Sequence, residues 1–268
     1  MSRGLGDVYK RQISRNVRKR SLDKVYADLD RMIAAGAALV KFVDRTYNLD
    51  ENYYLPIMQH LADAETDATF HFEIKADLLT ENVLNFLKTV PKGRFQFEIG
   101  VQTTNAATLK AINRRDNWAK LTANVKRLLS YGNIHLHLDL IAGLPYEGMA
   151  EFEKSFNDVY GLQPDMLQLG FLKVLPGTVM EKQRLEHELQ YMDEPPYEIL
   201  STKYMPYCAL RFLKVLEDVF EHTYNSGRFV YTLKYLTEAE GNAFAFYKKF
   251  AYLLIFLIIC LLYTSDAA

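Results

Sequence analysis

The stretch HLHLDLIAGLP, His135–Pro145, alternates polar and apolar side chains before a sharp turn. His135, His137 and Asp139 occupy one side of this alternation, and leucines occupy the other. A period of two residues is typical of a half-buried β-strand. The stretch therefore predicts a strand with one apolar face and one face that carries a carboxylate and imidazoles.

Two earlier stretches divide in the same way. FHFEIK (70–75) places phenylalanines and Ile74 opposite His71, Glu73 and Lys75, and FQFEIGVQ (95–102) places Glu98 and Gln102 on its polar side. Strands of a doubly wound sheet are covered on both faces and are almost wholly apolar. An ordinary eight-stranded barrel fills its interior with branched apolar side chains. The shared polar face instead predicts an open or partial barrel that holds a ligand.

The order of elements indicates repeated β–α units with parallel strands. Helical periodicity separates most of the strand-like runs, and right-handed crossovers allow either a barrel or a doubly wound sheet, between which the polar alternation decides. The expected strands are 39–45, 70–75, 95–102, 135–143 and 166–174, and the expected helices are 21–36, 51–64, 80–89, 121–131 and 150–160. After Pro176-Gly177-Thr178 the pattern becomes mostly helical, with no further strand of the barrel type. We therefore expect a barrel over residues 13–178 and a helical C-terminal domain over residues 179–259.

Composition narrows the class of protein. The 268 residues carry a formal net charge of −1, and without a basic stripe nucleic-acid binding is not indicated. Two cysteines, Cys208 and Cys260, form no zinc-like spacing and fit a reducing, cytoplasmic setting. The apolar run 250–263 is shorter than the roughly 20 residues of a membrane span, so no membrane association is expected.

The two ends carry an unusual relation at the level of DNA. DVYKRQ (7–12) is encoded by GAT GTG TAT AAG AGA CAG, and the reverse complement of that oligonucleotide, read one base in, encodes CLLYTS (260–265). This resembles a sequencing adapter translated at both ends. We expect residues 1–12 and 260–268 to be adapter-derived and the genuine sequence, about 13–259, to be truncated.

Polar residues gather near the carboxyl ends of the predicted strands, where active sites of β–α barrels lie. The set is Asp44, Glu73, Gln102 and Asp139, with Arg114 beyond the third of these strands. Carboxylates suit an amine or ribose hydroxyls, and a guanidinium suits a carboxylate. The combination matches an amino acid joined to a nucleoside.

These motifs resemble the radical S-adenosylmethionine (SAM) superfamily. FEIGVQTTNAATLKAINRRDN and HLDLIAGLPYEG resemble its third-to-fifth-strand motifs, and VKFVDRTYN resembles the second strand of its cobalamin-binding branch. PPYEIL and YNSGRF fit a C-terminal helical domain of one group in that branch. The resemblance implies a partial (β/α)6 barrel, here without its first strand, that uses SAM and a 4Fe-4S cluster. It also implies a reductant such as flavodoxin or ferredoxin, and cobalamin in the full-length protein.

The resemblance assigns a role to each candidate residue. Asp139 and Gln102 would reach the ribose or methionine part of SAM, Arg114 its carboxylate and Asp44 its amino group, with Glu73 as a further contact. The chain departs from the family because it has no CxxxCxxC, the motif whose cysteines hold the cluster. Its parent family comprises enzymes, but we expect the chain as it stands to be unable to bind the cluster or cleave SAM.

Other interpretations remain open. A barrel aldolase or hydrolase would need a Schiff-base lysine, for which Lys75 and Lys173 are candidates, or a metal set such as His137 with Asp139. A cluster-free module that binds a nucleoside or SAM is a third possibility. In structural terms, Glu73 and Glu98 could pair with Lys75 or an arginine, and His135 and His137 could be hydrogen-bonded core histidines.

Overall fold

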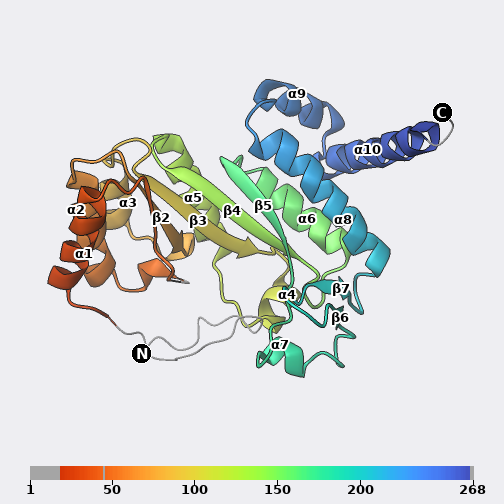
Figure 1. Cartoon of the computed structure of the whole chain (residues 1–268), viewed down its shortest axis with the longest axis horizontal. Helices are drawn as coiled ribbons and strands as arrows, with labels where there is room; N and C mark the ends of the chain where they lie inside the picture. Colours follow the sequence, from red (N-terminus) through yellow and green to blue (C-terminus); the bar gives the residue numbers. More distant parts are fainter. Residues whose placement is uncertain (1–18, 45, 266–268) are drawn as a thin grey trace. The chain divides into compact units, whose positions relative to one another are not determined.

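The computed structural model describes residues 19–44 and 46–265, with the side chains of 258–265 outside the description (Figure 1). Five strands form one parallel sheet in chain order β1-β2-β3-β4-β5. They are β1 Leu39–Lys41, β2 Thr69–Ile74, β3 Phe95–Gln102, β4 His135–Ala142 and β5 Met166–Phe171. The five predicted strands and the α/β fold class are confirmed.

Residue contacts divide the described chain into two compact units. The first contains residues 19–101 and 115–139, and the second contains residues 102–114 and 140–265. β4 continues from the first unit into the second, because the division falls between Asp139 and Leu140. The domain boundary expected at residue 178 stays a prediction.

Helices of the first unit begin and end at the residue types that local chemistry favours. They are α1 Leu22–Ala34, α2 Glu51–Asp63, α3 Glu81–Leu87 and α5 Trp118–Tyr131, with 3-10 turns at Tyr47–Leu49 and Ala76–Leu78. The side chains of Asp50, Thr80 and Asn117 accept hydrogen bonds from the first backbone amides of α2, α3 and α5. Gly132 ends α5 at φ +67°, a conformation that costs glycine little.

The core of the first unit forms on the apolar face of the sheet. β2 and β3 pair in parallel with Phe72 opposite Phe97 and Glu73 opposite Glu98, so the polar residues share the other face. The ring of Phe72 is fully buried and stacks on Phe42 at a centroid distance of 4.7 Å. The alternation seen in the sequence therefore sorts the side chains as predicted.

Elements of the second unit include a small sheet that the sequence analysis did not predict. Its members are α4 Ala106–Ala111, α6 Met149–Tyr160, α7 Val179–Lys182, the antiparallel strands β6 Gln190–Tyr191 and β7 Ile199–Ser201, α8 Tyr207–Phe220, a π-helical turn Glu221–Asn225, α9 Val230–Glu240 and α10 Ala243–Ser265. β6 and β7 are too short to show a periodic pattern. The amide of Ile199 donates to the carbonyl of Leu172, 2.9 Å away, which holds the β6–β7 hairpin beside the end of β5.

Aromatic side chains join α6 to the C-terminal helices. Phe220 of α8 lies 5.4 Å from Phe156 and 4.7 Å from Tyr247 of α10, measured between ring centroids. All three residues are at most 1% exposed. Edge-to-face contacts at these distances stabilise a core beyond the burial of apolar area alone. The helices after residue 206 thus share a core with a helix of the β–α series.

The remaining expectations concern the ends of the chain. The adapter-derived segment expected at residues 1–12 lies outside the described residues. For the segment expected at 260–268, only the backbone to Ser265 is described, as the end of α10. Within the described chain, no helix combines the length and apolarity that a membrane crossing requires.

Candidate functional site

Five titratable side chains of the first unit occupy the polar face of the sheet. We call His71, Glu73, Glu98, His137 and Asp139 the acid–imidazole cluster. Nε2 of His71 lies 3.2 Å from Oε2 of Glu98, and Nε2 of His137 lies 2.9 Å from Oδ1 of Asp139. Glu98 and Asp139 also hydrogen-bond to each other through their carboxyl groups. Neighbouring strands β2, β3 and β4 thus converge on one polar patch.

Burial and like charge set the protonation of this cluster. Burial, followed by the negative charges of Asp139 and Glu73, raises the pKa of Glu98 to about 7. Burial, followed by the charges of Lys41 and His137, lowers the pKa of His71. Near neutral pH, Glu98 therefore holds a proton for part of the time and can donate it in a hydrogen bond to Asp139. Such a patch offers both donors and acceptors to a ligand that carries hydroxyl or amino groups.

The structure brings together two of the predicted site residues. The negative charges of Asp139 and Glu73 both raise the pKa of Glu98, which lies between their strands. Asp44 lies in the loop after β1, exposed, and its charge adds to burial in raising the pKa of Tyr47. Among the alternatives, His137 fits the expected buried histidine, whereas His135 is exposed, because it begins β4.

Gln102 and Arg114 belong to the second unit. Gln102 is 4% exposed, and its Oε1 has no hydrogen-bond partner among the described residues. Its φ of +71° lies in the left-handed region, which is uncommon for a residue other than glycine and is found at functional sites. Arg114 is half-buried after α4, where its amide donates to the carbonyl of Leu109 at 2.8 Å.

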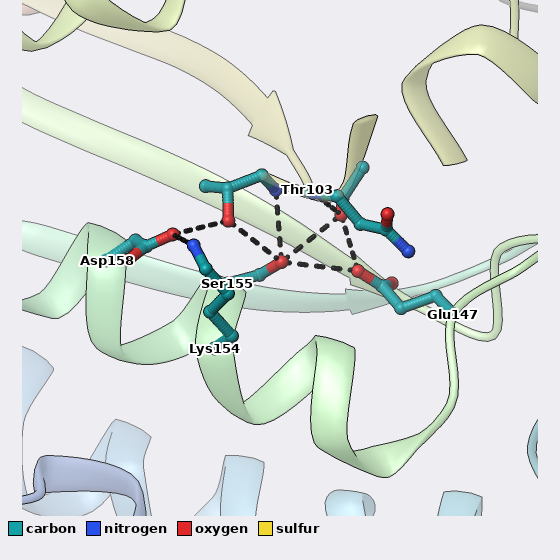
Figure 2. A network of polar contacts seen from close by, with 7 residues as sticks. Thr103, Glu147, Lys154, Ser155 and Asp158 are labelled. Carbon is teal, nitrogen blue, oxygen red and sulfur yellow. Dashed lines mark hydrogen bonds and ion pairs between the residues drawn. The ribbon is translucent and has the colours of Figure 1, made fainter. Parts of the chain in front are cut away.

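A buried hydroxyl–carboxylate network follows Gln102 directly, and the sequence analysis did not identify it. We call Thr103, Glu147 and Ser155 the loop clamp. Figure 2 shows their side chains pointing toward one another, with Thr103 donating to Oε1 of Glu147 at 2.5 Å. Thr103 is 44 residues from Glu147 in the chain, so no periodic signal connects them. The strand alternation did place Glu98 on the polar face. It could not show that Glu98 lies beside Asp139 of the neighbouring strand.

The candidate Schiff-base lysines are placed unfavourably for catalysis. Lys75 is 9% exposed, and its Nζ forms an ion pair with Asp116 and donates to the carbonyl of Arg115. Lys173 is exposed and bridges Glu198 through its backbone. Neither lysine is a free amine in an apolar pocket, which is how enzymes activate this nucleophile. The ion pair considered between Lys75 and Glu73 does not form, because Lys75 pairs with Asp116 instead.

The residues fit SAM better than they fit a cluster. In the first unit, the carboxylates of the acid–imidazole cluster suit amino and hydroxyl groups such as those of SAM. In the second unit, Oε1 of Gln102 is a buried acceptor with no partner among the described residues. A 4Fe-4S cluster needs thiolates, and the chain has only Cys208, exposed on α8, and Cys260. Within the described residues, no group of three or more histidine, cysteine or acidic side chains is arranged to hold a metal ion.

A five-stranded parallel sheet with carboxylates on one face places this chain among the α/β proteins. Comparison with known families makes the class specific. The sequence model of the radical SAM superfamily matches residues 7–159, which is more than half of the chain. This chain therefore belongs to the radical SAM superfamily. A second model, "Protein of unknown function (DUF4080)", matches residues 185–253.

Individual relatives share only part of their length with this chain. It is 30% identical over 138 residues to the heme chaperone HemW of Bacillus subtilis, covering 50% of this chain and 36% of HemW. Coproporphyrinogen III oxidase (HemN) from Escherichia coli superposes with a TM-score of 0.54 at 20% identity, covering 75% and 45% of the two chains. The cobalamin-dependent SAM radical enzyme OxsB gives a TM-score of 0.57 at 14% identity, covering 87% and 41%. These structural likenesses show the shared fold.

Proposed function

We propose that this chain is the SAM-binding portion of a radical SAM enzyme. The complete protein would reductively cleave SAM at a 4Fe-4S cluster held by cysteines that this chain does not contain. The observation that carries the proposal is the row of carboxylates from Glu73, Glu98 and Asp139 on the polar sheet face. Its support from outside the structure is membership of the family, whose chemistry uses SAM.

Each predicted residue has a role in this proposal. Asp139 and Gln102 bind the ribose or methionine part of SAM, and Arg114 pairs with its carboxylate. Asp44 binds the amino group, and Glu73 supplies a further contact. Two features support these roles: Oε1 of Gln102 is buried without a partner among the described residues, and Asp139 lies beside Glu98, whose pKa is raised to about 7.

The test is an equilibrium titration of the purified chain with SAM in the absence of iron. We expect weak but saturable binding, because the family's cluster contacts to SAM are missing. Asp139→Asn should weaken it by roughly ten- to a hundredfold, since a hydrogen bond to a charged group contributes roughly 1.5–3 kcal/mol. His135→Gln, an exposed change on the same strand, is the matched control. Equal affinity of Asp139→Asn and the parent chain would refute the role of Asp139.

Cobalamin dependence is proposed for the complete protein only. It is supported by the likeness of VKFVDRTYN to the cobalamin-binding branch. A complete, reconstituted protein supplied with SAM, reductant and hydroxocobalamin should release 5′-deoxyadenosine or S-adenosylhomocysteine. Product formation that does not change when cobalamin is omitted would remove cobalamin from the proposal.

A second candidate function is haem handling. Half of this chain can be aligned with HemW, whose name describes a heme chaperone, and this similarity favours the second candidate. Titration of the chain with hemin, followed by the position of the haem absorption band, distinguishes the two candidates. A saturable shift without SAM binding would favour haem handling, and SAM binding without a shift would favour the first proposal.

A further inference from the structure

The loop that follows β3 is held to α6 and to the β4–α6 loop by several hydrogen bonds within the second unit. The amide of Thr104 donates to Oγ of Ser155 at 3.0 Å, and its hydroxyl donates to Asp158 at 2.6 Å. The side chain of Asn105 donates to the carbonyl of Tyr146 at 2.8 Å. The loop thus has contacts along its length, and Gln102 directly precedes it.

Glu147 lies at the centre of these contacts. It is fully buried, and its Oε1 accepts from Thr103 at 2.5 Å and from Ser155 at 3.3 Å, as Figure 2 shows. Both hydroxyl groups are themselves buried. Removing the carboxylate would leave two buried donors without this acceptor, which costs more than the loss of an exposed hydrogen bond. A carboxylate at this position therefore stabilises one arrangement of the loop.

The backbone of Gln102 needs such support. A left-handed conformation costs an ordinary residue free energy and persists only where the surroundings fix it. Thr103, the next residue, receives that constraint from Glu147. The direction of the Gln102 side chain is thus coupled to a carboxylate 45 positions further along the chain.

We propose that Glu147 is a positioning residue, whose carboxylate holds the loop after β3 so that Gln102 is oriented for SAM. This inference rests on the proposed function, because it concerns the same ligand. In this role Glu147 does not contact SAM but holds Thr103 and Ser155. Its influence on SAM binding passes through Thr103 to Gln102.

Charge gives the loop clamp a distinctive pH profile. Burial raises the pKa of Glu147 to about 7, opposed by the two hydroxyl donors, and the nearby Glu151 raises it further. The other charged groups around the network are Asp158 and Lys154, which pair with each other on α6. The ionised carboxylate accepts hydrogen bonds more strongly than the protonated form. SAM affinity should therefore decline as the pH falls below about 7.

The experiment measures SAM dissociation constants for Glu147→Ala, Glu147→Gln and the parent chain between about pH 5.5 and 8.5, a range that includes the pKa of Glu147. Glu147→Ala should raise the dissociation constant about tenfold if the correct loop arrangement is populated about one tenth of the time. Glu147→Gln keeps an acceptor oxygen, so it should restore most of the affinity and lose the step near pH 7. The acid–imidazole cluster is the same in all three proteins, so the difference between Glu147→Gln and the parent chain isolates Glu147.

Two further variants separate positioning from general loss of stability. Thr103→Val should weaken SAM binding as a single variant. Combined with Glu147→Ala it should cause no further loss, because both changes remove the same hydrogen bond. Thr237→Ala removes a buried hydroxyl of α9 and should lower stability while leaving the SAM dissociation constant unchanged. Unchanged affinity in Glu147→Ala, or an additive effect of Thr103→Val, would overturn the proposal.

A failure of the proposed function would look different. If the parent chain binds no SAM, amide hydrogen exchange of residues 103–107 still tests the loop clamp without any ligand. Faster exchange there in Glu147→Ala than in Thr237→Ala would support the holding of the loop, and its absence would overturn it.

Discussion

At the scale of the residue, Glu98 makes the stability of the first unit depend on pH. Its pKa is raised from 4.5 to about 7 by burial and by the charges of Asp139 and Glu73. The folded state therefore binds a proton more tightly than the unfolded state, and the contribution of Glu98 is lost as the pH rises from 4.5 through 7. Glu98→Gln should reduce the fall in unfolding free energy between pH 5 and 7 by roughly 1–2 kcal/mol.

Urea denaturation at pH 5, 6 and 7, which covers about two units of the Glu98 titration, measures this difference. Glu65→Gln, a change at an exposed carboxylate, is the matched control and should keep the pH dependence of the parent chain. A Glu98→Gln variant whose stability falls with pH as steeply as that of the parent would show that Glu98 ionises normally in the folded state.

At the scale of the element, the turn that ends β4 depends on Gly143. Its φ is +85°, and a Cβ placed there would lie 2.8 Å from Cγ2 of Ile199 in β7. Gly143→Ala must therefore adopt a left-handed conformation and also displace the side chain of Ile199 in β7. We expect it to lower the unfolding free energy by about 2–4 kcal/mol, the sum of the two costs.

Gly132→Ala isolates the conformational part of that loss. Gly132 has φ +67°, and nothing lies within 4 Å of the position that an alanine methyl group would take, so only the left-handed cost of about 1–2 kcal/mol applies. Ile199→Ala in the Gly143→Ala background should recover part of the stability by making room. Equal losses in Gly143→Ala and Gly132→Ala, measured by chemical denaturation, would argue against close packing of β7 on the turn.

At the scale of the whole molecule, the chain carries the barrel's carboxylates without the cysteines of the cluster. We predict that anaerobic reconstitution with iron and sulfide yields no stoichiometric 4Fe-4S cluster, because only Cys208 and Cys260 are present. Iron and sulfide analysis after gel filtration, together with the absorption spectrum, measures this. Four irons per chain bound at a defined site would contradict the prediction, whereas loosely bound iron that a chelator removes would agree with it.

Features that depend on near neighbours in the chain could be predicted from the sequence alone. The two-residue alternation around Phe72, Glu98 and Asp139 predicted the strands and which side chains share a face, because that period follows from strand geometry. The motifs in FEIGVQ and HLDLIAGLP also predicted the superfamily, which the match over residues 7–159 confirms. The roles of Asp44, Glu73, Gln102, Arg114 and Asp139 in binding stay predictions.

Contacts between residues far apart in the chain could be found only in the folded structure. The effect of Asp139 on the pKa of Glu98 depends on β3 and β4 lying side by side, and the hydrogen bond from Thr103 to Glu147 spans 44 residues. The β6–β7 hairpin is fixed by a hydrogen bond to Leu172 rather than by its own short pattern. Burial then raises the pKa values of Glu98 and Glu147, because it removes the water that would stabilise their charges. Solvent exclusion belongs to the folded chain, so no local sequence pattern could have shown it.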